Sequence, residues 1–204
     1  MTKPVDKNIE LARWFDERGA KKSLTIKQYL ELVAAQDREQ ISDFIFHRLY
    51  GRYLKPFSFE DETFTEQFKN GFSIMANCCL LIETLQSFKN GWGDSNRKSE
   101  SAFKQFLATE KRFSVFVGKE REFYTNVRCG ILHQGETTGG WKINRKGVNL
   151  FDVKSLTVDS IKFAYELEKC LNEYSNNLKN AEWDSDLWDN FRVKMRKIIS
   201  NCTI

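Results

Sequence analysis

Apolar residues recur every three or four positions over most of this chain, which is the spacing of amphipathic α-helices. The clearest stripe covers residues 63–89 and consists of Phe64, Phe68, Phe72, Met75, Cys79, Ile82, Leu85 and Phe88. Cys78 and Leu81 widen this stripe, so we expect the helix to lie at the centre of the fold. Further helices are predicted over about 25–50, 99–113, 119–134, 157–178 and 185–200, with Thr25 as an N-cap and Gly135 as a C-cap.

The helical pattern is interrupted in three places. Residues 1–22 are polar and charged, with Trp14 and Phe15 as the only apolar anchor, which predicts a short N-terminal helix or a loose arm. Residues 56–62 are expected to form a loop. Over about 141–150, apolar and polar residues alternate around a central turn, which predicts a small β-hairpin. The predicted fold is therefore mainly α: a single domain over 1–204, built as a bundle of four to six helices with one inserted hairpin.

Composition and charge limit the classes of function. The chain has 204 residues, of which 41% are hydrophobic, and this is enough for one packed core. The net charge of +4 permits a nucleic-acid partner without requiring one. No apolar run approaches the roughly 18 residues of a membrane span, and the N-terminus lacks the apolar core of a signal peptide. The five cysteines include no CxxC pair, which favours a reduced, cytoplasmic protein.

The strongest candidate for chemistry is the stretch from Tyr124 to Glu136. It contains His133, one of only two histidines, and Arg128 five positions earlier. Histidine titrates near neutral pH, and arginine is a permanently charged, forked phosphate donor. Together they form a minimal set for cutting a phosphodiester without a metal. The same pair is also compatible with a helix-terminal histidine and a solvated arginine.

The spacing of this pair bears on where an active site could form. Five residues advance an α-helix by roughly 500°, which leaves Arg128 and His133 about 140° apart on a straight helix. The reach of arginine, the nearby helix end at Gly135, or a second copy of the helix across a dimer could each bring them together. The spacing makes a site within one chain awkward and a shared site plausible.

Three further sets of residues are candidates for supporting roles. Asn126 could orient the histidine or hold a phosphate oxygen, or it could be a solvated helix residue. Glu83 interrupts the central apolar stripe; if it is buried it needs a partner, for which Arg128 is a candidate, and otherwise it lies on an exposed face. The basic residues of the predicted hairpin tip could grip phosphates or form a solvated turn; they are Lys142, Arg145 and Lys146.

Other chemistry is not indicated by the sequence. No phosphate-binding glycine loop occurs, and no cluster of His, Asp and Glu has the spacing of a metal site, so no cofactor and no metal are expected. Cys129 lacks a fixed base and is expected to be a small core residue. His47, the other histidine, is interpreted as structural.

The run Asn126-Val-Arg128-Cys-Gly-Ile-Leu-His133-Gln-Gly-Glu136 resembles the signature of HEPN domains, in which a histidine follows an arginine late in a helical bundle. The segment from Met75 to Phe88 is similar to the helix that packs against this motif. The resemblance implies a two-fold dimer and a metal-independent endoribonuclease of a toxin, antiphage or RNA-processing system. It implies that Arg128 binds the scissile phosphate while His133 transfers protons, with the RNA 2′-hydroxyl attacking to leave a cyclic phosphate. RNA, a second copy of the chain and a cognate regulatory protein are the partners that it suggests.

One position departs from the family pattern. Active HEPN domains commonly carry a polar residue after the arginine, whereas this chain has Cys129. Three hypotheses follow. The first is the dimeric ribonuclease, and the second is a non-catalytic HEPN-like module that binds a nucleotide or a protein. The third is a helical interaction protein in which Arg128 and His133 point apart.

Overall fold

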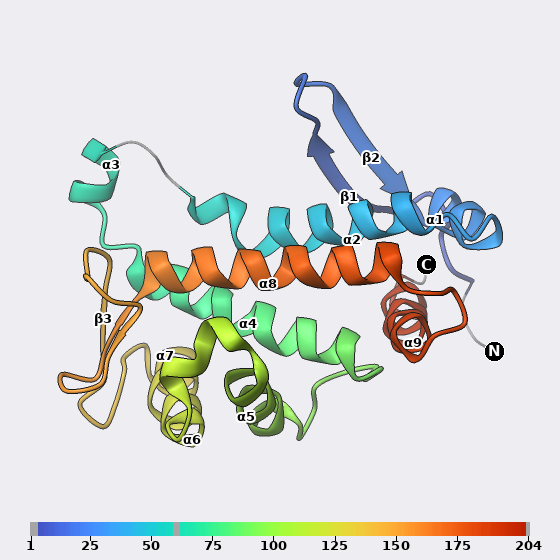
Figure 1. Cartoon of the computed structure of the whole chain (residues 1–204). Helices are drawn as coiled ribbons and strands as arrows, with labels where there is room; N and C mark the ends of the chain where they lie inside the picture. The colour runs from blue at the N-terminus through green and yellow to red at the C-terminus, as the bar shows by residue number, and fades with distance from the viewer. Residues whose placement is uncertain (1–3, 59–61, 203–204) are drawn as a thin grey trace. The chain divides into compact units, whose positions relative to one another are not determined.

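The computed structural model describes residues 4–58 and 62–202, and its fold is mainly helical, as predicted (Figure 1). The helices are α1 (Ile26–Ala34), α2 (Arg38–Tyr53), α3 (Glu62–Gln67), α4 (Gly71–Lys89), α5 (Ser99–Thr109), α6 (Glu120–Phe123), α7 (Gly130–Gln134), α8 (Ser160–Asn180) and α9 (Asp186–Ser200). Lys55–Phe57 and Lys111–Phe116 form short 3₁₀ turns, and Tyr124–Cys129 forms a π turn. Within the described ranges, no helix is long and apolar enough to cross a membrane.

The chain folds into two compact units. Unit 1 consists of Met1–Arg52, Leu85–Asp94 and Leu171–Ile204, and unit 2 consists of Tyr53–Thr84 and Ser95–Cys170. Helices α4 and α8 are each divided between the two units: α4 after Thr84 and α8 after Cys170. The expectation of a single domain over residues 1–204 stays a prediction.

Unit 1 contains a β-hairpin, so the prediction of a short helix or loose arm over residues 1–22 is wrong for residues 10–22, while residues 1–3 lie outside the described residues. Strand β1 (Glu10–Phe15) pairs antiparallel with β2 (Lys21–Thr25). The turn forms because Asp16 Oδ1 accepts hydrogen bonds from the backbone N–H groups of Arg18 (3.0 Å) and Ala20 (2.8 Å). Gly19 supplies the positive φ of 76° that the turn requires. The alternation of apolar and polar residues that indicates a strand is weak here, because both strands contain charged residues and few of their residues are buried.

The first helical region of unit 1 is split in two. Thr25 caps α1 as predicted, and its hydroxyl and the side chain of Gln28 form a reciprocal capping box. The chain then adopts a positive φ of 52° at Gln36, which ends α1 and separates it from α2. The single helix predicted over 25–50 is therefore two helices, because left-handed backbone cannot continue a helix.

Aromatic packing forms the core of unit 1. Phe88 lies 5.6 Å from the ring of Phe191 and 6.4 Å from that of Tyr174. Trp188 is fully buried, and its indole N–H donates to the Leu178 carbonyl at 3.0 Å. This contact fixes α9 against the end of α8.

Unit 2 is built around the N-terminal part of α4 and a second aromatic cluster. Its fully buried rings include Phe103, Phe106, Phe113, Phe116, Phe123 and Phe163. The helix predicted over 63–89 is interrupted at residues 68–70, between α3 and α4, and the one predicted over 99–113 ends at Thr109. The loop expected over 56–62 includes residues 59–61, which lie outside the described residues, and its described start is the 3₁₀ turn.

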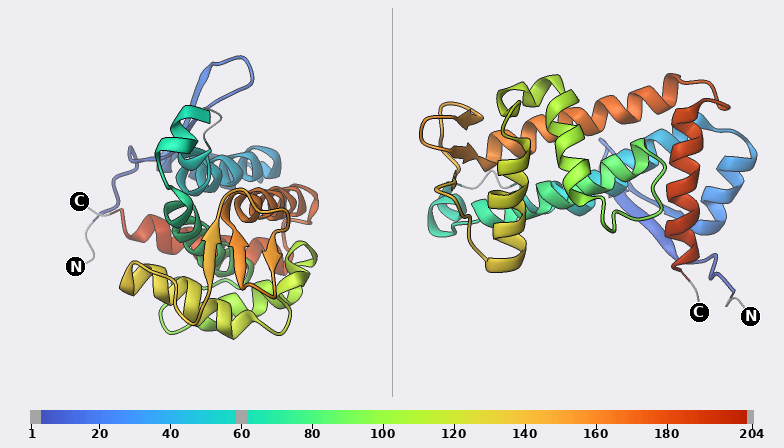
Figure 2. Two further views of the ribbon diagram at one scale, coloured as in Figure 1. Left: turned by 90° about the vertical axis from the view of Figure 1, so that its left-hand side faces the viewer. Right: turned by 90° about the horizontal axis from the view of Figure 1, so that it is seen from below.

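A small mixed sheet replaces the hairpin predicted over about 141–150. Strands β3 (Lys142–Asn144), β4 (Phe151–Asp152) and β5 (Thr157–Asp159) have the order β3-β5-β4, with β5 parallel to β3 and antiparallel to β4 (Figure 2). The hairpin prediction is wrong: no strand lies at residues 145–150, the next strand is β4 at Phe151–Asp152, and β5, which follows later in the chain, lies between β3 and β4. Asp159 stabilises this insertion by accepting a hydrogen bond of 2.6 Å from the Gly147 N–H.

Candidate functional site

The candidate site of unit 2 lies on a helical segment that changes its winding. The segment starts as α6, passes through the π turn Tyr124–Cys129 and continues as α7. Gly135 ends α7 in the left-handed conformation, with a φ of 72°, as the sequence predicted. Gly130 permits the chain beyond this cap to fold back, because a Cβ at residue 130 would lie 2.5 Å from the Glu136 carbonyl oxygen.

Arg128 and His133 lie side by side within one chain. The distance from Arg128 Nη1 to His133 Nε2 is 3.2 Å. No second copy of the chain is needed to bring the two side chains together. Arg128 lies near the end of the π turn and His133 lies in α7, so a straight α-helix does not describe the whole segment. The long side chain of arginine spans the remaining separation.

This contact defines the hydrogen-bonding state of the histidine. A guanidinium carries only donors, so it can bond only to a ring nitrogen with a free lone pair. Nε2 of His133 is therefore the acceptor, and the ring proton is carried by Nδ1. His133 is exposed, so Nε2 lies where a ligand could replace the guanidinium as its partner.

Glu83 anchors Arg128 from the central helix. Its Oε1 accepts hydrogen bonds from Arg128 Nε at 2.8 Å and Nη2 at 2.7 Å, and only 9% of the Glu83 side chain and 14% of the Arg128 side chain are exposed. Burial acts to lower the pKa of Arg128, but the charge and hydrogen bonds of Glu83 outweigh it and the pKa is raised. The expected pairing of a buried Glu83 with Arg128 is present, and it leaves Nη1 directed to His133.

Two serines hold the other oxygen of this carboxylate. Ser95 Oγ donates to Glu83 Oε2 at 3.1 Å, and Ser99 Oγ donates at 2.8 Å. Ser95 lies in the loop before α5, and Ser99 is the first residue of α5. This contact could not be predicted from the sequence, because a polar loop is ordinarily solvated and nothing in its spacing pairs it with α4.

Tyr124 and Cys129 border the arginine. The Arg128 Cζ atom lies 5.7 Å from the centre of the Tyr124 ring, and Arg128 Nη1 lies 4.0 Å from Cys129 Sγ. Burial and a hydrogen bond with Cys129 raise the pKa of Tyr124. Cys129 is only partly buried, so it borders the site and is not the core residue that the sequence predicted.

Asn126 supports the loop after α7. Its Oδ1 accepts a hydrogen bond of 2.9 Å from Thr138 Oγ1, and its carbonyl accepts another of 2.9 Å from the Thr138 N–H. Gly139 packs so closely that a Cβ there would lie 2.6 Å from Asn126 Oδ1. The side chain of Asn126 is therefore occupied by the loop at residues 137–140.

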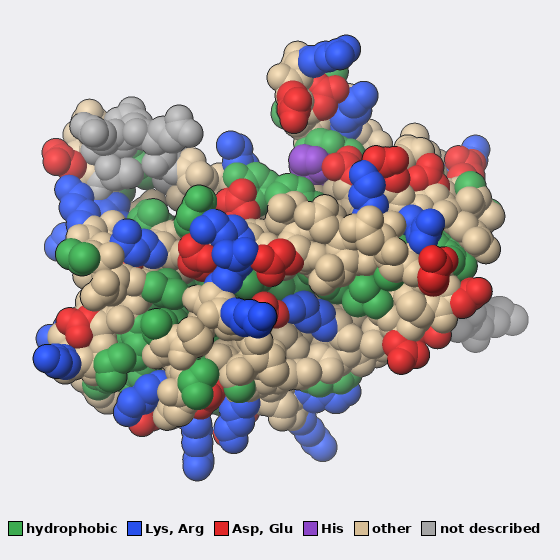
Figure 3. Space-filling model, in the orientation of Figure 1, with side chains coloured by type: hydrophobic (Ala, Val, Ile, Leu, Met, Phe, Trp, Pro, Cys, Tyr) green, Lys and Arg blue, Asp and Glu red, His purple; other side chains and the backbone are tan. Residues whose placement is uncertain are grey.

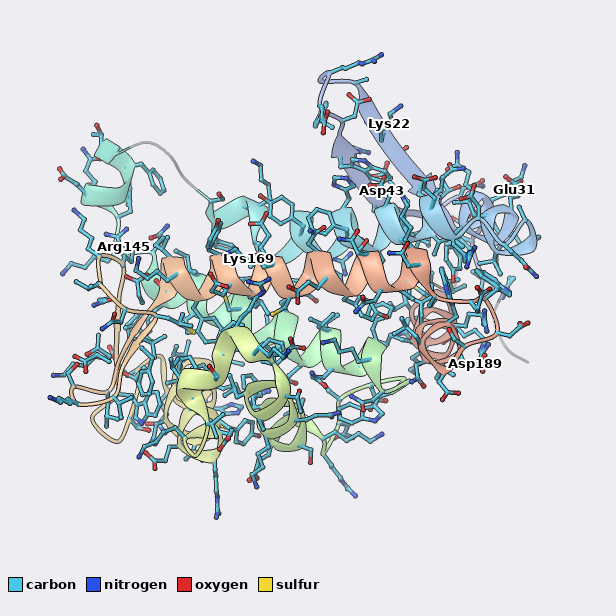
Figure 4. The ribbon with its side chains drawn as sticks, viewed as in Figure 1. Lys22, Glu31, Asp43, Arg145, Lys169 and Asp189 are labelled. Atoms are coloured by element: carbon cyan, nitrogen blue, oxygen red, sulfur yellow. The ribbon has the colours of Figure 1, made fainter. Side chains whose placement is uncertain are left out.

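The predicted basic group does not form a hairpin tip. Arg145 donates to the Phe68 carbonyl at 2.7 Å and to Asn70 Oδ1 at 2.8 Å, and so joins the end of β3 to the segment before α4 (Figure 4). Lys146 is exposed and lies 4.0 Å from Glu66, and Lys142 is exposed. The structure assigns Arg145 a packing contact and leaves both lysines at the surface.

Comparisons of the chain with family models, curated proteins and solved structures find no match. In the part of the chain that the structure describes, no group of three or more His, Cys, Asp or Glu side chains is arranged to hold a metal ion. The function must therefore be argued from the contacts of Arg128 and His133 themselves.

Proposed function

We propose that this protein is a cytoplasmic, dimeric, metal-independent endoribonuclease of HEPN type, with Arg128 and His133 as its catalytic residues. The observation that carries this proposal is the 3.2 Å contact between Arg128 Nη1 and His133 Nε2. A permanent cation and an exposed proton acceptor thus lie within reach of one phosphodiester. All five cysteines are free thiols, which is compatible with a reducing compartment.

The proposed reaction is an intramolecular transfer within the RNA. Nε2 of His133 accepts the proton of the 2′-hydroxyl, and the 2′-oxygen forms a bond to phosphorus. Arg128 Nη1 turns from the histidine to a non-bridging oxygen, where it stabilises the charge of the transition state. The bond from phosphorus to the 5′-oxygen breaks, which leaves a 2′,3′-cyclic phosphate and a 5′-hydroxyl.

The leaving 5′-oxygen needs a proton at the moment when His133 has just accepted one. A second histidine in the protonated state would supply it. The second copy of an exposed His133 across a two-fold axis is the simplest source, and this is the reason for proposing a dimer. A defence or toxin setting, with a cognate regulatory protein, is proposed by analogy with HEPN systems alone.

The surface of unit 2 is compatible with a polyanionic substrate. Figure 3 shows Lys and Arg side chains projecting along the lower edge of the molecule, over α5 and α6. On these two helices, the Arg121 side chain is 81% exposed and that of Lys104 is 50% exposed. Such exposed cations attract RNA phosphates and make binding depend on salt.

The test is cleavage of a labelled RNA in EDTA by the full chain. Arg128→Ala and His133→Ala should each abolish cleavage, whereas Arg18→Ala and Gln134→Ala serve as matched controls and should retain it. A substrate with 2′-deoxyribose at the cut site should remain intact, because the attacking oxygen is missing. Cleavage that survives both Arg128→Ala and His133→Ala would refute the proposal.

One observation favours a second candidate, a non-catalytic module that binds a nucleotide or a protein partner. Arg128 is already engaged by Glu83 on two nitrogens, and Cys129 borders it where HEPN enzymes commonly have a polar residue. This alternative predicts no turnover of any RNA, together with thermal stabilisation by a ligand. That stabilisation should be lost in Arg128→Ala.

A further inference from the structure

A cleft of unit 1 is rich in arginine. It lies between β1 and α2, the elements at the base of the hairpin in Figure 1, and has a volume of about 280 Å³. Its charged or titratable lining residues are Glu10, Arg13, His47, Arg48 and Arg52. We propose that this cleft binds the phosphate group of a small molecule through Arg13, Arg48 and Arg52.

The arrangement of charges in this cleft favours an anion. Arg48 and Arg52 are four residues apart on α2, where two like charges face one another and destabilise a helix. Arg13 joins them from β1. The one lining carboxylate, Glu10, already accepts from Nε and Nη2 of Arg13 at 3.1 and 3.0 Å. The lining of the cleft therefore carries three guanidinium groups and one carboxylate, and forked guanidinium donors match the oxygens of a phosphate.

Arg48 gives the cleft a fixed donor. This residue is only 9% exposed, and its Nη1 donates to the Leu11 carbonyl of β1. A guanidinium held in place by the backbone loses little freedom when it binds a ligand, and its burial raises the energetic value of a nearby negative charge.

Gly51 leaves space between the two arginines of α2. It lies inside the helix, where glycine is unfavourable compared with alanine, and no atom beyond its chain neighbours and the adjoining helix backbone lies within 4 Å of the position of a Cβ there. Packing against a neighbour therefore does not account for this glycine. It does lower the wall of the cleft and lets a ligand approach the helix backbone.

An aromatic surface adjoins the cleft. His47 also lines a neighbouring cleft of about 450 Å³, together with Trp14 and Phe15. The Trp14 ring stacks on His47 with centroids 5.0 Å apart, and Phe15 is 65% exposed. Aromatic rings beside arginines are suited to a nucleotide, whose base stacks while its phosphate binds the cations.

Calorimetric titration of the full chain with AMP, inorganic phosphate and adenosine tests this proposal. We expect the phosphate-bearing probes to bind and adenosine to bind at least about tenfold more weakly than AMP, because a charged hydrogen bond is lost. Tighter binding of AMP than of inorganic phosphate would assign a nucleotide, and equal affinity would assign the phosphate alone. Absence of binding by both, or equal binding of adenosine and AMP, would overturn the proposal.

Single substitutions distinguish binding in the cleft from non-specific attraction by surface charge. Arg52→Ala should weaken binding by about tenfold or more. Arg18→Ala removes the same charge from the hairpin turn, outside the cleft, and should leave affinity nearly unchanged. Glu10→Gln should tighten binding, because it frees Arg13. Equal losses in Arg52→Ala and Arg18→Ala would contradict the proposal. His133→Ala, which disables the proposed ribonuclease, should bind the probe normally, so the two proposals fail independently.

Discussion

Ser99 and Glu83 are joined by a hydrogen bond of 2.8 Å from Ser99 Oγ to Glu83 Oε2, while Arg128 Nε and Nη2 bind the Oε1 atom of the same carboxylate. The hydroxyl therefore fixes the plane of the carboxylate, and the carboxylate in turn aims the guanidinium at His133. Ser99 acts through Glu83 and Arg128, so it is a positioning residue.

Ser99→Ala should lower the rate constant of the proposed RNA cleavage by about 10- to 100-fold while leaving KM little changed, because small displacements of an aligned group are costly. The loss of one hydrogen bond should reduce the free energy of unfolding by only about 1 kcal/mol. Single-turnover kinetics and urea denaturation measure the two effects. Ser99→Thr keeps the hydroxyl and should restore the rate. A Ser99→Ala variant with wild-type kinetics would show that Glu83 needs no such support.

The buried ion pair of Glu83 and Arg128 should be strongly coupled. Glu83→Gln leaves the guanidinium without its countercharge, and we expect a loss of about 3 kcal/mol in the free energy of unfolding. The double variant Glu83→Gln/Arg128→Met should lose less than the sum of the two single variants, because no unpaired charge remains. The exposed pair of Glu100 and Lys104 is the control. Its coupling should be no more than about 0.5 kcal/mol, and a similar coupling for both pairs would refute this account.

The sequence predicted the fold class because helix periodicity depends only on which residues are apolar. The prediction failed where the strand order depends on a segment far away in the sequence. Strand β5 lies between β3 and β4, and no local sequence pattern indicates this order. The hairpin at residues 10–25 was missed because charged residues occupy most of its exposed face.

The candidate site was predicted in part for similar reasons. Residue type was enough to propose Arg128 and its pairing with Glu83, and His133 stood out because the chain has only two histidines. The contact within one chain was only one of several alternatives, because five residues leave Arg128 and His133 about 140° apart on a straight α-helix, and the spacing does not reveal the π turn at Tyr124–Cys129. Asn126 and Arg145 looked like functional residues, yet both bind backbone or neighbouring side chains of unit 2. Such contacts depend on the loops after α7 and before α4.

Two glycines on helices offer a matched pair of substitutions. Gly130→Ala places a Cβ 2.5 Å from the Glu136 carbonyl oxygen, so the loop after α7 must move, and we expect a loss of about 2 kcal/mol in the free energy of unfolding. Gly51→Ala meets no atom within 4 Å and should gain about 0.5–1 kcal/mol from helix propensity. Thermal denaturation of both variants checks the prediction. Equal effects of the two substitutions would show that the fold of the loop does not depend on Gly130.

The hairpin turn of unit 1 should loosen in acid. Hydrogen bonds from the backbone of Ala20, and then of Arg18, hold the pKa of Asp16 below its ordinary value of 3.8, and Lys22 adds to this. Because the folded pKa is lowered, the charged carboxylate stabilises the turn above the unfolded pKa, and this support is lost as the pH falls through the lower folded value. The Ala20 amide resonance should therefore titrate below about pH 4 in NMR spectra. Asp16→Asn removes the titrating group and should abolish this transition. A transition that persists in Asp16→Asn would assign it to another carboxylate and refute the role given to Asp16.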